Sequence, residues 1–363
     1  MKKILIFSAL LTFLCTVSLS AQIQTLQWQG VQRQYIVRVP DNPSGPMPVM
    51  FFLHGLGDNV TNCDQSFNFS LLSNHYGWVI VTPQARNEGL GTMWNVGLLN
   101  SSTDDEGFLM ALLDTLEVQY SLNPDSVFFT GFSMGGFMTH MMAIKHGDRI
   151  TACAPVSGVI TNALASQAPV APVRMLHIHG TSDNVVGYNG YSSTFSMNLG
   201  IGVDAIMDYW KNANSCEGEP TIDSIPDLVN DGLRFVHYTY DCGTDLQLLK
   251  VIGGAHEWYD NGNHYDVSYM DIIYNFFKGT DDPSGINNHE MKSLKLWPNP
   301  TNGIVSIEVE IATTVSVMDV QGRVVSQHEL QPGASQLDLR HLPDGIYFVK
   351  DQTGATTKIV VEK

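Results

Sequence analysis

Short apolar runs alternate with helix-like segments from Tyr35 to about Lys278. Most of these runs are continuously apolar, which is typical of strands buried on both faces of a parallel sheet. They lie at residues 49–53, 78–82, 127–130, 151–155, 175–179 and 246–252. Residues 33–39 instead alternate between polar and apolar, a pattern that suits an edge strand. We therefore predict an α/β fold, with a mostly parallel sheet and helices on both faces.

One amphipathic segment predicts a helix over residues 104–120. Its apolar face comprises Phe108, Leu109, Leu112, Leu113 and Leu116. Thr103 and Glu106 have the spacing of a capping box, and Asp104 and Asp105 suit the positive end of the helix dipole. Capping accounts for these acids better than a catalytic role does, because such caps are common where helices begin.

The amino-acid composition and the predicted elements change near residue 279. Residues 279–288 are polar and rich in Gly, Asp, Asn and Pro, which indicates a linker. Only short strand-like runs follow, at residues 305–309, 315–318, 336–339, 347–350 and 358–361. We predict a first folded domain over residues 22–279, a linker over 280–292 and a small all-β sandwich over 293–363.

The N-terminus has the pattern of a signal peptide over residues 1–21. Lys2 and Lys3 are followed by an apolar stretch and by small residues, so we expect cleavage near Ser20 or Ala21. The apolar stretch is shorter than the roughly 20 residues that span a bilayer, and no later segment is long and apolar enough. The sequence predicts a mature protein outside the cytoplasm, with no transmembrane segment.

The charge of the chain limits its possible binding partners, and its cysteines indicate which disulfides it can form. The formal net charge is −17, which argues against nucleic-acid binding, because that rests on basic residues that neutralise phosphates. An exported protein can form disulfides. Cys153 lies in an apolar run and is expected as a buried free thiol, whereas Cys216 and Cys242 bracket a polar excursion that a bridge would tie down. The state of Cys63 stays open. No Cys-x-x-Cys spacing occurs, so we expect no metal.

Residues 131–135, Gly-Phe-Ser-Met-Gly, have the form of a nucleophile elbow centred on Ser133. A glycine-rich turn without chemistry could show the same letters. The context favours the elbow, because the motif directly follows the predicted strand 127–130 and directly precedes a helix-like segment from Met134 to about Lys145.

Two further residues complete a Ser, Asp, His order along the chain. Asp183 follows the predicted strand 175–179, and His256 follows the predicted strand Leu246–Ile252 and two glycines. The carboxyl ends of parallel strands meet at one edge of a sheet, where α/β folds build their sites. We therefore predict a catalytic triad of Ser133, Asp183 and His256.

A third motif predicts an oxyanion hole. Residues 53–57, Leu-His-Gly-Leu-Gly, follow a predicted strand, so the backbone N–H groups of Leu56 and Met134 are the expected donors. Trp94 and Trp258 are candidates to line the substrate pocket, and Trp258 could equally be a core residue. His177 and His179 share one strand face. Buried core histidines are favoured there over a metal pair, because no third ligand is evident.

In several of these motifs the chain resembles the extracellular polyhydroxybutyrate depolymerase and feruloyl or acetylxylan esterase group of α/β-hydrolases. The similar stretches are residues 53–55 (LHG), 94–95 (WN), 104–108 (DDEGF), 130–136 (TGFSMGG), 154–158 (APVSG), 177–183 (HIHGTSD) and 254–258 (GAHEW). The resemblance implies the triad and the oxyanion turn, and it supports a Cys216–Cys242 bridge. Polymer depolymerases often have cysteine where this chain has Leu56, so a polyester substrate is less favoured.

The predicted sandwich resembles the sorting domain of type IX secretion. The similar residues are 296–300 (LWPNP), 302–303 (NG), Asp319, 322–323 (GR), 342–347 (LPDGIY) and 358–363 (KIVVEK). The resemblance implies export through outer-membrane secretion machinery. A carbohydrate-binding sandwich is the alternative, but no exposed aromatic platform is apparent.

These features favour a secreted serine esterase that acts through an acyl-enzyme and needs no cofactor. A serine peptidase of the prolyl-oligopeptidase type would share the fold and the triad order, but the chain has no large repeat domain. A non-catalytic secreted binding protein with a decayed hydrolase domain is the remaining alternative. The complete triad argues against it.

Overall fold

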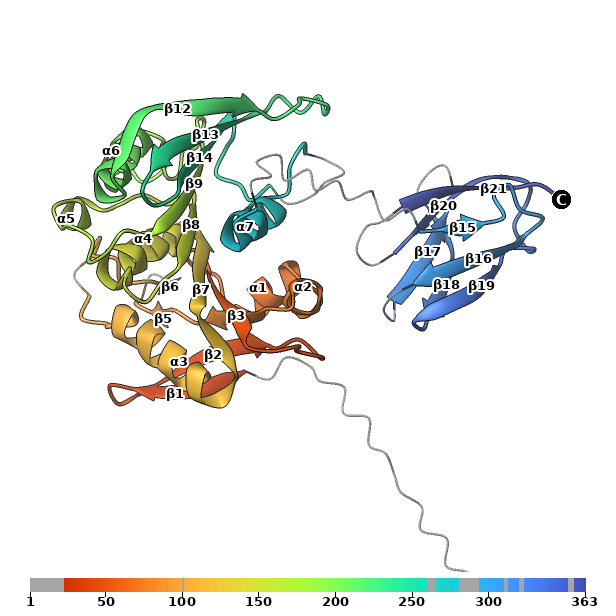
Figure 1. Ribbon diagram of the computed structural model, residues 1–363, viewed down its shortest axis with the longest axis horizontal. Coiled ribbons are helices and arrows are strands. Elements are labelled where there is room, and N and C mark those ends of the chain that lie inside the picture. The colour runs from red at the N-terminus through yellow and green to blue at the C-terminus, as the bar shows by residue number, and fades with distance from the viewer. Residues whose placement is uncertain are drawn as a thin grey trace, which may run out of the picture. The chain divides into compact units, whose positions relative to one another are not determined.

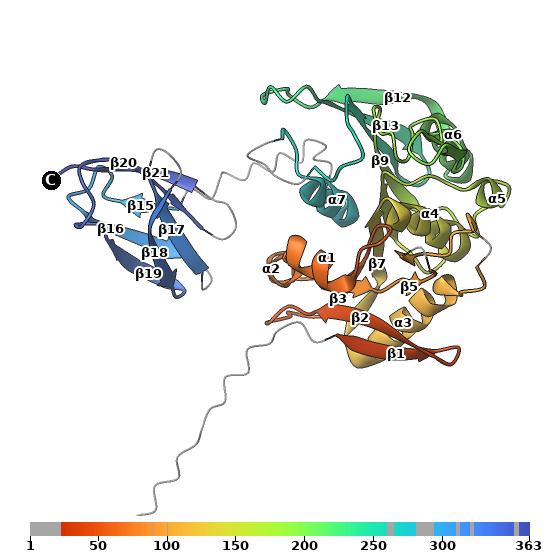
Figure 2. The same ribbon diagram turned by 180° about the vertical axis from the view of Figure 1, so that it is seen from behind.

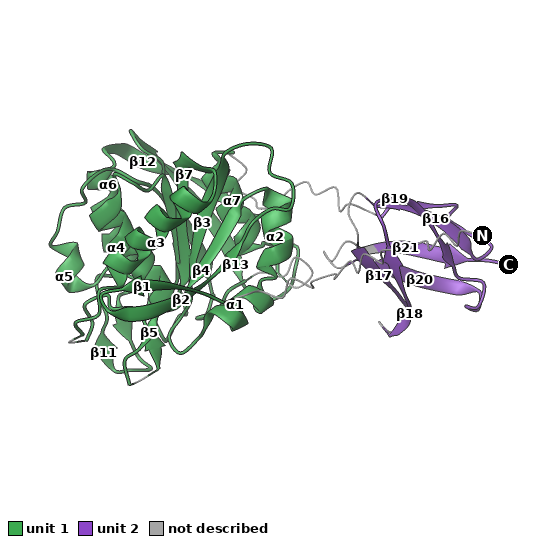
Figure 3. Ribbon diagram, turned by 90° about the horizontal axis from the view of Figure 1, so that it is seen from below, with its two compact units in different colours: residues 1–285 green, residues 286–363 purple. Residues whose placement is uncertain are grey.

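The computed structural model describes residues 23–280, apart from 90, 100 and 260–264, and residues 294–363, apart from 310–312, 320–322 and 352–355. The chain forms two compact units, residues 1–285 and 286–363 (Figure 3). The predicted signal peptide lies outside the described residues, and so does the predicted linker except for Thr280. Each unit is described separately.

A ten-stranded sheet forms the centre of the first unit (Figure 1). In spatial order its strands are β1 (Gln24–Trp28), β2 (Val31–Arg38), β4 (Val79–Pro83), β3 (Met47–Leu53), β7 (Leu122–Phe132), β8 (Ala152–Val156), β9 (Arg174–Gly180), β14 (Leu246–Ile252), β13 (Arg234–Cys242) and β12 (Cys216–Ser224). Neighbours from β4 to β14 pair in parallel, and those at both ends pair antiparallel. This confirms the predicted mostly parallel sheet.

Helices cover both faces of this sheet (Figures 1 and 2). One face carries α3 (Asp105–Gln119), α4 (Met134–His146) and α6 (Val203–Ala213), and the other carries α1 (Val60–Ser66), α2 (Phe69–Tyr76) and α7 (Tyr269–Lys278). Alternate residues of β3 enter the two cores: Phe51 packs on the first face, and Met50 and Phe52 pack on the second. Burial on both sides explains why the strands are continuously apolar.

Several short elements lie in the connecting loops of this unit. They are α5 (Asn162–Ala165), the strand pair β5 (Arg86–Asn87) and β6 (Thr92–Met93), and the strand pair β10 (Tyr191–Ser192) and β11 (Met197–Asn198). Both strand pairs are antiparallel hairpins apart from the main sheet. The β10–β11 hairpin follows the loop that carries Asp183.

The edges of the sheet differ from the sequence prediction. The alternating residues 33–39 fall mostly within β2, which pairs with β1 on one side and with β4 on the other, so the prediction of an edge strand is wrong. The edge is β1, which folds back on β2 through a turn in which Gln29 and Gly30 have positive φ. A half-exposed strand next to an antiparallel edge strand has the same alternation of polar and apolar residues as an edge strand.

The polar excursion at the opposite edge forms the long hairpin of β12 and β13. Cys216 and Cys242 lie directly opposite each other in this ladder and are joined by a disulfide, which confirms the predicted bridge. Cys153 is a buried free thiol as predicted, and Cys63 is also free and buried. Burial raises the pKa of both thiols, so they stay protonated and unreactive.

The start of α3 corrects a detail of the sequence analysis. Asp104, not Thr103, is the N-cap, and its Oδ1 accepts a hydrogen bond of 2.9 Å from the amide of Gly107. The Thr103 hydroxyl donates instead to Glu88, and Glu106 pairs with Lys145 and His146 of α4. The predicted capping box is therefore wrong, because partners distant in sequence take both of its side chains.

The second unit is an all-β sandwich, as predicted. One sheet contains β15 (Leu296–Trp297), β16 (Ile304–Val309) and β19 (Gly333–Asp338). The other contains β18 (Val324–Leu330), β17 (Thr313–Met318), β20 (Gly345–Lys350) and β21 (Thr356–Val361). Both sheets contribute to one apolar core that includes Val305, Leu337, Val317 and Val349.

Candidate active site

Ser133 lies at the sharp turn between β7 and α4, with φ of 56° and ψ of −120°. Few residues with a side chain adopt this conformation, and it is typical of functional sites. A Cβ on Gly135 would lie 1.8 Å from the carbonyl oxygen of Leu53, and one on Gly131 would lie 2.6 Å from the same oxygen. The turn packs so closely against the end of β3 that only glycine fits on either side of the serine.

Asp183 and His256 lie on loops that follow the neighbouring strands β9 and β14. Main-chain hydrogen bonds join the two loops, including one of 2.9 Å from the amide of Ser182 to the carbonyl of Gly254. His256 Nδ1 lies 2.7 Å from Asp183 Oδ2. The side chain of Asp183 is fully buried, whereas that of His256 is 13% exposed.

The hydrogen bonds of Asp183 determine the tautomer of His256. Asp183 Oδ1 accepts hydrogen bonds from the amides of Val185 and Val186, at 2.9 and 2.8 Å. Because an ionised carboxylate only accepts, the hydrogen atom in its contact with His256 belongs to Nδ1 of the imidazole. In the neutral form of this tautomer the proton is on Nδ1 and Nε2 is the acceptor, which is the arrangement a general base requires.

The predicted oxyanion turn lies beside the elbow. A Cβ on Gly55 would lie 3.6 Å from Cβ of Ser133. Among the hydrogen bonds of the described residues, none uses the amide of Leu56 or of Met134 as its donor. Two unused N–H groups next to a serine are what an oxyanion hole requires.

His54 holds this turn, a role that the sequence analysis did not assign. Its Nδ1 donates a 2.7 Å hydrogen bond to the carbonyl of Gly55, and its Nε2 accepts from the amide of Ala85 at 3.1 Å. Burial lowers the pKa of His54, which keeps the ring neutral. In a trans peptide C=O and N–H point in opposite directions, so fixing the Gly55 carbonyl also directs the Leu56 amide.

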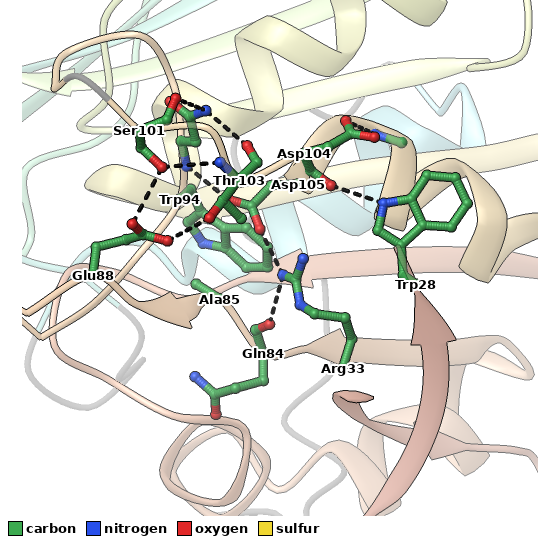
Figure 4. Close-up of polar contacts among 12 residues, drawn as sticks. Trp28, Arg33, Gln84, Ala85, Glu88, Trp94, Ser101, Thr103, Asp104 and Asp105 are labelled. Atoms are coloured by element: carbon green, nitrogen blue, oxygen red, sulfur yellow. Dashed lines mark hydrogen bonds and ion pairs between the residues drawn. The ribbon is translucent and has the colours of Figure 1, made fainter. Parts of the chain in front are cut away.

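Polar side chains that contact His54 form a network, and Figure 4 shows the part of it around Arg33. Arg33 donates to Asp105 at 2.6 Å and to the carbonyl of Gln84 at 3.1 Å. The side-chain amide of Gln84 reaches His54 Nε2 at 2.9 Å, and the indole of Trp94 donates to the His54 carbonyl at 2.9 Å. Burial lowers the pKa of Arg33 and raises that of Asp105, because it penalises each charge.

The two tryptophans of the sequence analysis lie on different sides of the site. Trp94 is fully buried behind the oxyanion turn and also borders a small cavity of about 80 Å³. Trp258 is half-buried and packs edge-on against Phe52 and Phe67, with ring centroids 5.4 and 5.2 Å apart. Contact with substrate therefore stays a proposal for both indoles.

Phe132, the residue before Ser133 in the chain, contacts the imidazole of His256. The two ring centroids are 4.8 Å apart and the ring planes are tilted by 31°. Among the contacts of the described residues, no hydrogen bond joins the Ser133 hydroxyl to His256. Catalytic hydrogen bonds are often long without substrate and shorten when it binds.

Among the described residues, no group of three or more His, Cys, Asp or Glu side chains could hold a metal ion. No helix in the described ranges is long and apolar enough to cross a membrane.

The strand order, the elbow after β7 and the turn after β3 define the α/β-hydrolase class. Residues 36–197 match the family described as Phospholipase/Carboxylesterase, and residues 295–362 match the family described as Secretion system C-terminal sorting domain. The first unit therefore has the α/β-hydrolase fold and is similar to this carboxylesterase family over residues 36–197, and the second unit is similar to secretion-system sorting domains.

Curated relatives share the first domain. A bifunctional acetylxylan esterase/xylanase of Neocallimastix patriciarum is 29% identical over 63% of this chain and 31% of its own length. Feruloyl esterase B of Piromyces equi is 26% identical over 52% of this chain and 37% of its own length. A probable feruloyl esterase C of Aspergillus niger is 29% identical over 61% of this chain and 76% of its own length. The chain thus spans about a third of the first two relatives.

A solved structure has the same fold. The acetyl xylan esterase from Aspergillus awamori superposes with a TM-score of 0.51 at 16% identity, covering 70% of this chain and 99% of that one. At this identity the likeness concerns the fold alone.

Proposed function

We propose that this protein is a secreted serine hydrolase of carboxylic esters. The observation that carries the proposal is the 2.7 Å contact between Asp183 and His256, on loops beside the strained elbow of Ser133. His256 Nε2 takes the proton of Ser133, whose oxygen attacks the ester carbonyl. Asp183 orients the imidazole and stabilises its charged form.

The carbonyl oxygen becomes negatively charged during this attack. The amides of Leu56 and Met134 stabilise it, with His54 fixing the direction of the first. The tetrahedral intermediate then releases the alcohol, which takes the proton from His256, and leaves an acyl-enzyme on Ser133. Water, activated by His256, releases the acid and restores the serine.

For the substrate, we propose feruloyl or acetyl esters of polysaccharides. Relatives named as feruloyl and acetylxylan esterases support this class. Hydroxyalkanoate polyesters are the second candidate, because the chain resembles their depolymerases in the stretches around the triad. We propose in addition that Trp94 and Trp258 line the pocket that selects among these substrates.

For the route out of the cell, we propose a signal peptide followed by recognition of the C-terminal unit by outer-membrane secretion machinery. The match of residues 295–362 to a secretion-system sorting domain supports this route. The mature esterase would then act outside the cell or at its surface.

The decisive test replaces the proposed nucleophile. In Ser133→Ala we expect turnover of a p-nitrophenyl ester to fall by about 10⁴-fold or more, because triad members act as a unit. Circular dichroism should show an unchanged fold. Near-normal turnover in this variant would refute the assignment.

Substrate class is tested on the wild-type protein. A feruloyl ester, an acetylated xylan and a hydroxybutyrate oligomer would be compared by kcat/KM. We expect one of the first two to be preferred.

A further inference from the structure

A row of three buried imidazoles runs from the helix layer to the acid loop. His140 lies on α4, and His177 and His179 lie on the same face of β9. His140 Nε2 is 3.2 Å from His177 Nδ1, and His177 Nε2 is 3.2 Å from His179 Nδ1. All three side chains are fully buried. We call these residues the histidine row.

Both ends of the histidine row impose the same hydrogen-bond direction. At one end, the indole N–H of Trp210 lies 3.4 Å from His140 Nδ1 and only donates. At the other end, His179 Nε2 lies 2.7 Å from the carbonyl of Val186, which only accepts. Each histidine must therefore carry its proton on Nε2 and accept on Nδ1, and every nitrogen in the row is satisfied.

This arrangement requires neutral rings. A protonated imidazole has two donors, so charging any member would set two N–H groups against each other. Burial lowers the pKa of all three histidines, that of His140 to about 3. The row therefore remains an uncharged hydrogen-bond chain at neutral pH.

The far end of the row meets the residues that hold Asp183. The Val186 carbonyl accepts from His179, while the Val186 amide donates to Asp183 Oδ1 at 2.8 Å. His179 Nε2 also lies 3.7 Å from Asp183 Oδ2, the oxygen that contacts His256. The aligned imidazole dipoles direct their N–H ends toward this buried carboxylate.

The near end of the row belongs to the helix that starts at the elbow. His140 lies on α4, which follows Ser133 directly. The row therefore connects the element that carries the serine with the loop that carries the acid, across two layers of the fold.

We propose that His140, His177 and His179 are positioning residues, which fix Asp183, and through it His256, relative to Ser133. This inference rests on the proposed triad. None of the three touches the reacting atoms. They affect catalysis by holding Asp183 in position. Misplacement of a catalytic group by about 1 Å can reduce a rate by about 10²-fold.

The test compares two substitutions at the end of the row. Leucine at position 179 removes the donor to Val186, whereas glutamine can keep an N–H near the position of Nε2. We expect His179→Leu to lower kcat by about 10²-fold with little change in KM, and His179→Gln to restore about tenfold of that loss. His140→Leu, farther from Asp183, should lose less than His179→Leu.

His237→Leu is the matched control. His237 is buried, with 3% exposure, but lies on β13 and bonds to Gln247 outside the row. Its kcat per folded molecule should equal that of the wild type. Equal losses in His179→Leu and His237→Leu, or no rescue by glutamine, would assign the row to core packing and overturn the inference.

Two outcomes separate this inference from the proposed function. If the wild type hydrolyses esters and His179→Leu keeps its kcat, the inference fails alone. If the wild type hydrolyses no ester, the proposed function fails and the inference with it.

Long-range ¹H–¹⁵N NMR of the wild type gives a readout that needs no variant. The three imidazoles should appear as Nε2–H tautomers that do not titrate between about pH 5 and 8. An imidazolium or an Nδ1–H tautomer in the row would overturn the inference even if the variants failed to fold.

Discussion

The two units bury very different interiors. The hydrolase unit encloses polar and charged side chains such as His54, Asp105, His177 and Asp183 in its core. Among its described residues the sorting unit buries Thr301 and the ring of Tyr347, whose hydroxyl donates to the carbonyl of Pro343, within an otherwise aliphatic core. Buried polar groups are costly unless each is hydrogen-bonded. They are concentrated here in the unit that contains the candidate active site, and the described part of the second unit has few.

Ion pairs show the same contrast. In the hydrolase unit, Arg33 and Asp105 are 3% and 0% exposed and lie 2.6 Å apart. In the sorting unit, Arg340 and Asp338 lie at the same distance but are 64% and 57% exposed. Equal distances therefore do not imply equal contributions to stability, since solvent screens the exposed pair.

Breaking the buried pair should give the largest change in stability. In Arg33→Met the charge of Asp105 loses its partner in the core, so we expect the free energy of unfolding of the hydrolase unit to fall by about 3–5 kcal/mol. Arg33→Met with Asp105→Leu should recover most of it. Chemical denaturation monitored for each unit measures both effects. Arg340→Met is the control and should leave unfolding unchanged; equal effects of the two arginine substitutions would contradict the comparison.

Removing the disulfide should have the next largest effect. Replacing Cys216 and Cys242 by alanine lets the unfolded chain open the closed loop, so the hydrolase unit should lose about 2–4 kcal/mol. The transition of the sorting unit, which has no disulfide among its described residues, should stay in place. Peptide mapping without reduction checks the bridge directly, and recovery of both cysteines as free thiols would refute it.

Acid should destabilise the hydrolase unit more steeply than the sorting unit. The pKa of His140 is lowered by burial to about 3. Below about pH 6.5 an unfolded histidine binds a proton that folded His140 does not, so stability falls as the pH falls. His140→Met should reduce the slope of unfolding free energy against pH by about 1.4 kcal/mol per pH unit between about pH 6 and 4. An unchanged slope would show that His140 is charged or solvated in the folded protein.

Truncation should have the smallest effect on catalysis. Every proposed catalytic residue precedes Gly279, so a chain ending there should keep its ester hydrolysis and the thermal transition of the hydrolase unit. In the native host the truncated protein should accumulate in the periplasm, which fractionation would detect. Loss of activity would make the sorting unit part of the catalytic domain. Unaffected export would favour a binding role for it.

The parallel strands and the elbow could be predicted because their causes are local. A strand buried on both faces must be apolar at every position, and the turn around Ser133 admits only glycine at positions 131 and 135. The order of Asp183 and His256 along the chain followed from the same reasoning. These predictions depend on single segments and on their place at strand ends.

The buried polar contacts between distant segments could not be predicted. His140 and His177 are 37 positions apart, and Arg33 and Asp105 are 72 apart. Chain topology brings these pairs together, and no spacing in the sequence records it. The hairpin of β12 and β13 was not predicted for another reason: β12 buries none of its side chains, and in β13 only Phe235 and His237 are buried, so neither strand has a continuous apolar run.

Strand β12 leaves one edge of the main sheet open, and open edges are where folded proteins begin to aggregate. Pro220 has no N–H to offer a further strand, and the register shifts after Glu217. Glu217, Glu219 and Asp223 are exposed along the strand, so a second copy would bring like charges together. The proline, the register shift and the exposed carboxylates together make this edge a poor template for a strand from a second molecule, so they oppose aggregation through the main sheet.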